Sequence, residues 1–183
     1  MYRVSIHDTL RAVLRPADLL VLLGLLKPAL APDWSVRSLA ADLELPQAAV
    51  QRSLARLGET PVYDPRRRRV NRTAAEELFT RAVPYIAPAE LGAPTRGMPT
   101  AWAAAPLSEH ISGNELPPVW PEARGKTRGL AVAPLHEGAL RAARADPWLY
   151  GMLALIDGVR IGDARVRGVA ADLLRERLSE VPA

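Results

Sequence analysis

The chain has 183 residues and a formal net charge of +4, and this length suits one medium-sized domain or a small domain with an accessory region. It contains no cysteine, which excludes disulfides, thiolate catalysis and cysteine-ligated zinc, and its three histidines lack ligand-like spacing, so we expect neither a metal nor a cofactor. The longest apolar run, residues 19–26, is far shorter than the ~20 residues of a membrane span, and no signal-peptide pattern opens the sequence, so we expect a cytoplasmic protein.

Three helices are predicted in the first sixty residues. Residues 16–27 begin with a proline, which suits the first helical position, and are apolar on nearly every side, so this helix should be buried. Ser35 is a good N-cap for a short helix over 36–43, whose apolar residues recur at helical spacing. A third helix is expected from Pro46 to Gly58, and the short turn before it makes the pair a helix-turn-helix.

A β-hairpin and a further helix are predicted next. The runs 61–63 and 70–71 are short and β-prone, and they flank an Asp-Pro turn, which is typical of a hairpin. The tip of this hairpin carries four consecutive arginines, Arg66–Arg69. The helix that follows has capping-box spacing at Thr73, and we expect Pro84 to end it.

Residues 84–134 are rich in proline, with nine of the seventeen prolines of the chain, so long regular helices are not expected there. The segment also contains too many apolar residues for a flexible tether. We interpret it as an ordered, loop-rich segment that packs on a partner surface. Within it, residues 119–120 and 130–132 are expected to pair as a small hairpin around residues 122–129.

The sequence ends in a predicted helical hairpin, with helices over 147–161 and 163–180 that begin at the N-caps Asp146 and Asp163. We interpret Asp157 as a charge on the surface of the first helix. The apolar stripe of each helix is wider than one two-helix contact can cover, so it must bury against the first domain, a second copy or a foreign partner. A second copy is the surface that we favour. The side chains concerned are Leu153, Ile156, Leu173 and Leu174.

The positive charge of the chain is concentrated in one short segment. Residues 35–72 carry eight arginines and four acidic residues, for a net charge of +4, whereas residues 1–34 sum to +1 and residues 73–183 to −1. A concentrated positive charge is typical of a surface that binds phosphate groups.

The order of helix, helix-turn-helix, basic hairpin and helix resembles the winged-helix transcriptional regulators, loosely of the MarR kind, over about residues 10–87, with its specific core at residues 38–57. The resemblance implies binding to duplex DNA, with the third helix entering the major groove and the hairpin, or wing, touching phosphates or the minor groove. A departure is Glu44, since the turn in this family often holds glycine. The residues to which the resemblance gives DNA contacts are Ser35, Gln47, Gln51, Arg52, Arg56, Arg66, Arg67, Arg68 and Arg69.

The expected fold is mainly α with a small β-hairpin wing, an α+β arrangement. We expect a DNA-binding domain over 1–87, a connecting segment over 88–134, and a helical hairpin over 135–183 for dimerisation or partner binding. The function that this organisation favours is a homodimeric, sequence-specific repressor, since no group of residues indicates an enzyme. The alternative is an antitoxin-like protein that neutralises a toxin enzyme and regulates its own operon. The region after residue 85 is similar to the C-terminal part of uncharacterised bacterial winged-helix proteins that we associate with toxin–antitoxin operons.

Overall fold

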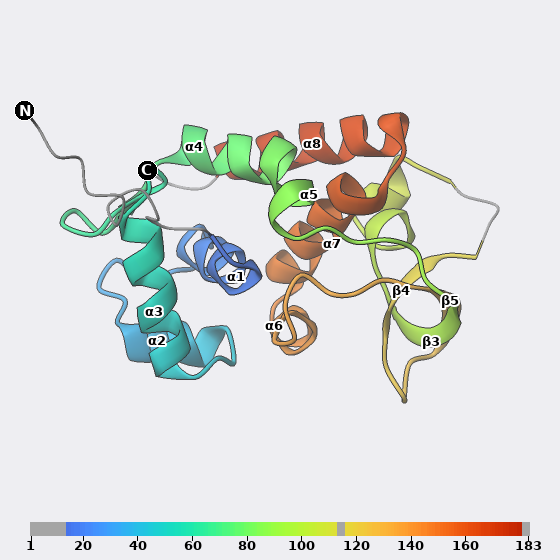
Figure 1. Ribbon diagram of the computed structural model, residues 1–183, viewed down its shortest axis with the longest axis horizontal. Helices are drawn as coiled ribbons and strands as arrows, with labels where there is room; N and C mark the ends of the chain where they lie inside the picture. Colours follow the sequence, from blue (N-terminus) through green and yellow to red (C-terminus); the bar gives the residue numbers. More distant parts are fainter. Residues whose placement is uncertain (1–13, 113–115, 181–183) are drawn as a thin grey trace, which may run out of the picture.

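Helix α1 (Pro16–Leu25) is buried along nearly its whole length, and the next two helices pack against it (Figure 1). The structure is a computed structural model that describes residues 14–112 and 116–180. The start of the sequence, where we expect no signal peptide, lies outside these ranges. Pro16 is the first helical residue, as predicted, and its missing N–H removes a donor that would have no partner at that position.

Helices α2 (Val36–Asp42) and α3 (Gln47–Gly58) are joined by a short turn, and both were predicted within about a residue. The Ser35 side chain caps α2 by accepting the backbone N–H of Ser38, which confirms the predicted N-cap. Each helix turns its apolar residues towards α1, with Leu39 of α2 and Leu57 of α3 fully buried. The periodic apolar spacing therefore defines the packing of this part of the chain.

Strands β1 (Tyr63–Asp64) and β2 (Arg69–Val70) form the predicted antiparallel hairpin. A helical run then follows through α4 (Arg72–Glu77), the π-helical turn η2 (Leu78–Ala82) and α5 (Val83–Ile86).

Two expectations for this helical run are wrong. The N-cap is Asn71, whose side chain accepts the N–H of Ala74, rather than a capping box beginning at Thr73. Pro84 also does not end the run, which continues to Ile86. Proline lacks the N–H of an ordinary helical bond, and the π turn directly before it widens the helix where that bond would form.

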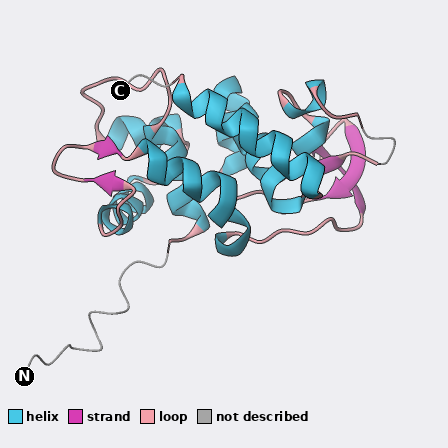
Figure 2. Ribbon diagram, turned by 90° about the horizontal axis from the view of Figure 1, so that it is seen from above, coloured by secondary structure: helices cyan, strands magenta, loops and turns pink. Residues whose placement is uncertain are grey.

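Strands β3 (Pro94–Pro99), β4 (Pro118–Pro121) and β5 (Thr127–Ala131) form a small closed unit at the far end of the molecule (Figure 2). The short turns η3 (Ala101–Ala103) and η4 (Leu107–Glu109) lie between β3 and β4 in the sequence.

The pairing within this strand unit corrects an expectation. Strand β3 is antiparallel to both of its neighbours, and β4 and β5 run parallel to each other instead of forming a hairpin. The strands can lie this close together only because two positions are glycine. A Cβ at Gly97 would overlap the carbonyl oxygen of Trp120, and a Cβ at Gly129 would overlap the carbonyl oxygen of Pro117.

Helices α6 (Ala139–Ala145), α7 (Pro147–Ile161) and α8 (Ala164–Ser179) complete the chain, and α7 and α8 form the predicted helical hairpin. Asp146 and Asp163 cap α7 and α8 with their side chains, as expected. Helix α7 is the central element, since α6, α8, η3 and α5 all pack on it (Figure 1).

The apolar stripes of α7 and α8 are covered mainly by the chain itself. Leu153, Ile156 and Leu174 are at most 1% exposed, and Leu173 is partly buried against the same core. Of the three covering surfaces named above, the chain's own first part therefore buries these residues together with its middle, and the second copy that we favoured is not needed for it. Helices α4 and α5 and the π turn cover this surface from the first half of the chain, and the short turns η3 and η4 cover it from the middle. The described part of the chain is a mixed α+β fold.

Candidate nucleic-acid interface

Helix α3 has one buried and one exposed face. Val50 and Leu57 are fully buried against the N-terminal core. Gln47, Gln51 and Arg52 lie on the other face and are exposed, as the sequence predicted. Two amides and a guanidinium are thus presented together on a helix that packing holds in place.

Arg56, one turn further along α3, does not project freely into solvent as we expected. Its Nε and Nη2 atoms donate to the two carboxylate oxygens of Asp18 at 2.8 and 2.5 Å, and the Asp18 side chain is fully buried in α1. The hydrogen bond to Asp18 raises the pKa of Arg56 above its usual value. Arg56 therefore ties α3 to α1, and its position is set by a structural ion pair.

The hairpin tip is ordered by an aspartate turn. The Oδ1 atom of Asp64 accepts the backbone N–H groups of Arg66 and Arg67 at 2.9 and 3.1 Å. Chiefly through the bond from Arg67, this turn lowers the pKa of Asp64. The side chains of Arg66, Arg67 and Arg69 are exposed around the tip, which gives a compact group of three cations beside α3.

Arg68 points away from the other three arginines of the tip. Its guanidinium donates to the backbone oxygen of Trp34 and lies over the indole ring, 4.1 Å from the ring centroid. The residue has a φ of 54°, a left-handed conformation that non-glycine residues seldom adopt. A groove of about 590 Å³ lies between the hairpin and the loop after α1, and Arg68 bridges it.

Two further residues named from the sequence lie at the ends of α2. Ser35 is exposed, but its hydroxyl and its N–H are both engaged with Ser38 in the cap. Glu44 has a φ of 50°, so it occupies the left-handed position that glycine would fill most easily. Its carboxylate lies 3.6 Å from the guanidinium of Arg141, which partly neutralises the acid in this turn.

A buried polar network in the centre of the molecule was missed by the sequence analysis. Asp157 is fully buried rather than on the surface of α7, and its carboxylate accepts from the Thr100 hydroxyl at 2.7 Å, the Trp120 indole N–H at 2.6 Å and the Arg160 guanidinium at 2.5 Å. Burial raises the pKa of Asp157, and Arg160 opposes that rise. The only signal in the sequence was the spacing of Asp157 and Arg160 inside an apolar helix.

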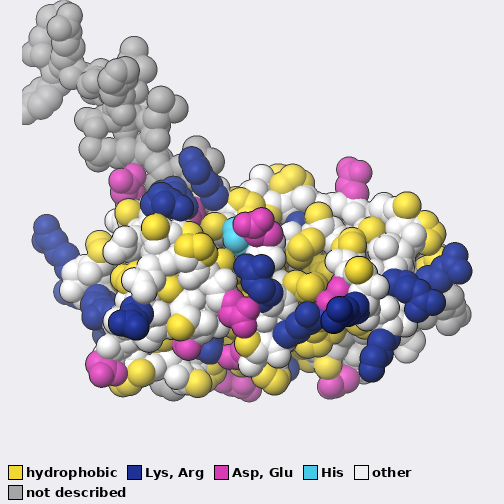
Figure 3. Space-filling view, turned by 90° about the horizontal axis from the view of Figure 1, so that it is seen from below, with side chains coloured by type: hydrophobic (Ala, Val, Ile, Leu, Met, Phe, Trp, Pro, Cys, Tyr) yellow, Lys and Arg dark blue, Asp and Glu magenta, His cyan; other side chains and the backbone are white. Residues whose placement is uncertain are grey.

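Charged side chains of both signs lie across the face seen from below (Figure 3). Lysines and arginines lie at both of its ends and in its middle, and acidic side chains are interspersed among them. Among the described residues there is no group of three or more side chains suited to hold a metal ion, and no helix is long and apolar enough to cross a membrane.

Comparison with known proteins identifies no relative. No family model matches the chain, and neither a curated protein nor a solved structure is significantly similar to it. The exposed α3 face and the hairpin arginines are therefore interpreted from their own geometry and chemistry.

Proposed function

We propose that this protein is a winged-helix regulator that binds duplex DNA and reads its sequence with α3. The observation that carries the proposal is the exposed row of Gln47, Gln51 and Arg52 beside the three exposed arginines of the hairpin tip. A helix fits the major groove, where glutamine pairs with adenine and arginine with guanine.

The hairpin has the position of a wing in this proposal. It directly follows α3, and β1 packs against that helix. The side chains of Arg66, Arg67 and Arg69 would touch backbone phosphates, which carry no sequence information but fix the orientation of the protein. Arg68 and Arg56 are left out of the DNA contacts, because their guanidinium groups are engaged within the chain.

We further propose that the protein acts as a cytoplasmic repressor, and as a homodimer on a two-fold symmetric operator. Helix pairs that bind half-sites one DNA turn apart are typical of such regulators. This part of the proposal rests on the geometry of DNA recognition alone, since the apolar stripes of α7 and α8 are already covered.

The salt dependence of DNA binding tests the wing. Replacement of Arg66, Arg67 and Arg69 by alanine should weaken binding to all duplexes alike and lower the salt slope by about 0.9 for each phosphate that the protein no longer neutralises. Arg165→Ala, which removes an exposed arginine from α8, is the control and should leave the slope unchanged. An unchanged slope in the triple variant would place the wing away from DNA.

A further inference from the structure

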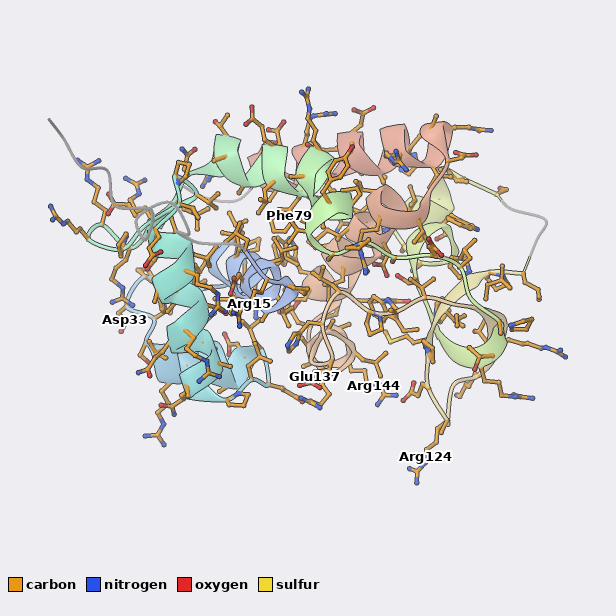
Figure 4. The ribbon with its side chains drawn as sticks, in the orientation of Figure 1. Arg15, Asp33, Phe79, Arg124, Glu137 and Arg144 are labelled. Atoms are coloured by element: carbon orange, nitrogen blue, oxygen red, sulfur yellow. The ribbon has the colours of Figure 1, made fainter. Side chains whose placement is uncertain are left out.

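A second group of exposed cations lies on the strand unit, at the opposite end of the molecule from α3 (Figures 1 and 3). It consists of Arg96 on β3, Arg128 on β5, and Arg124 and Lys126 in the connection between β4 and β5. We name these four residues the distal basic surface. Figure 4 shows Arg124 pointing away from the strands at the tip of that connection.

The charges of the distal basic surface are not compensated within the described part of the chain. Arg96 and Arg128 are directly opposite each other in the antiparallel β3–β5 pair, and like charges in that position destabilise a sheet. Glu122, the acidic residue that follows β4, is already bonded to Arg144 of α6. The fold thus keeps an unfavourable cross-strand pair of arginines, and a bound anion would relieve the repulsion.

The composition of this surface favours phosphate groups over an acidic protein. Three of its four side chains are arginines, whose planar guanidinium matches phosphate with two parallel hydrogen bonds. Protein interfaces have apolar anchors at their centre. The large exposed apolar side chains of the described residues are Tyr85, Leu91 and Leu116, and none of them belongs to residues 94–99 or 121–128.

We propose that the distal basic surface binds the phosphate backbone of duplex DNA without reading its sequence. The inference rests on the proposed function, because a protein that reads an operator with α3 would gain a second, sequence-independent contact. These phosphates can come from two sources, either a distant part of the same duplex or a second duplex.

The test compares two variants of the full chain with the same change in charge. Arg96→Gln with Arg128→Gln alters the distal basic surface, whereas Arg81→Gln with Arg165→Gln alters exposed arginines of η2 and α8. DNA binding is measured as a function of salt concentration. One duplex is short and contains only the sequence that the protein prefers, and the other is long and extends beyond that sequence. Capture of a labelled second duplex by protein on an immobilised duplex is measured in parallel.

If the phosphates belong to the same duplex, the distal variant should lower the salt slope by about 1.8 on the long duplex and not on the short one. If they belong to a second duplex, the distal variant should no longer capture the labelled duplex. The control variant should change neither measurement. Arg96→Lys with Arg128→Lys keeps the charge and should retain binding, which separates loss of charge from any loss of fold.

The inference would be overturned if the distal variant kept both the salt slope on the long duplex and the capture of the labelled second duplex. Binding of a polyglutamate peptide in preference to DNA would also overturn it. Failure of the proposed function would give a different result from failure of this inference. If α3 does not read the DNA sequence, Gln51→Ala with Arg52→Ala would not change which DNA sequence the protein prefers, while the distal variant would still change the salt slope.

Discussion

The carboxylate of Asp157 and the guanidinium of Arg160 form a buried ion pair one helical turn apart on α7, with 2.5 Å between Oδ1 and Nη1. The same guanidinium donates to the backbone oxygen of Ala87 at 2.7 Å and to that of Ala133 at 3.1 Å. These two carbonyls follow α5 and β5, so the pair fastens two distant parts of the chain to the central helix.

Loss of the Asp157 carboxylate should therefore be severely destabilising. Asp157→Ala leaves the buried guanidinium of Arg160 without its counter-charge, and breaking a buried pair in this way costs about 3–5 kcal/mol. Urea unfolding followed by circular dichroism measures the loss. Asp172→Ala is the control, because Asp172 forms a pair of the same spacing with Arg175 but is 79% exposed, and its loss should cost less than about 1 kcal/mol. Equal effects of the two variants would contradict the account.

Substitution of two arginines on α3 should show that one of them stabilises the fold and that the other does not. Arg56→Ala leaves the carboxylate of Asp18 buried and unpaired, and we expect a loss of about 2–3 kcal/mol, below the range for fully buried pairs because the Arg56 side chain is 22% exposed. Arg52 is exposed, so Arg52→Ala should leave the free energy of unfolding within about 0.5 kcal/mol. Unfolding curves of both variants decide this, and an Arg56→Ala protein as stable as the parent would show that the pair is not structural.

The extent to which the sequence predicted this structure depends on how local each signal was. Helices α1, α2, α3, α7 and α8 follow from caps and apolar spacing within a few residues of each other, and so does the β1–β2 hairpin. The parallel pairing of β4 and β5 depends on β3, which pairs with both of them and is about twenty residues distant in sequence from β4.

The two arginines of the candidate interface whose surroundings we predicted wrongly show the same dependence on distant parts of the sequence. Arg56 and Arg68 both belong to basic, polar stretches that a sequence pattern assigns to solvent. Their partners, Asp18 and the backbone of Trp34, are more than thirty residues away. Gln47 and Gln51 were placed correctly because helical periodicity alone decides which face of α3 is buried.

The glycines of the strand unit should not tolerate a methyl group. Gly97→Ala would place a Cβ on the carbonyl oxygen of Trp120, so we expect loss of the β3–β4 pairing and a large fall in the thermal unfolding midpoint. Gly168→Ala is the matched control, because a Cβ at Gly168 of α8 meets nothing within 4 Å. That variant should gain about 0.5–1 kcal/mol, since alanine is the better helix former. Thermal unfolding with equal midpoints for the two variants would refute the close packing.

Acid should weaken the ion pair between Lys27, which follows α1, and Asp146, the N-cap of α7. Burial acts to raise the pKa of Asp146, but the Lys27 ammonium, 2.7 Å away, and the backbone N–H groups of Leu149 and Trp148 outweigh it, and the pKa is lowered. A carboxyl group whose pKa is lower in the folded than in the unfolded chain stabilises the fold at pH values above its unfolded-state pKa of about 3.9. This stabilisation is lost as the pH falls through the folded-state pKa.

Asp146→Asn keeps a capping side chain but removes the charge, so it isolates this effect. The difference in unfolding free energy between the parent and Asp146→Asn should be constant near neutral pH and shrink below pH of about 4. Chemical unfolding across that range measures it. A difference that grows in acid would give the linkage the opposite sign and contradict the assignment.

The central claim is that α3 reads the sequence of duplex DNA, and selection of bound duplexes from a random pool tests it most directly. The parent protein should enrich one motif. Gln51→Ala and Arg52→Ala should each relax the preference at particular base pairs, at a cost of about 1–3 kcal/mol there, while non-specific binding is nearly unchanged. Arg165→Ala should enrich the same motif as the parent. Enrichment of no motif, or of an identical motif by the parent and both α3 variants, would contradict the account.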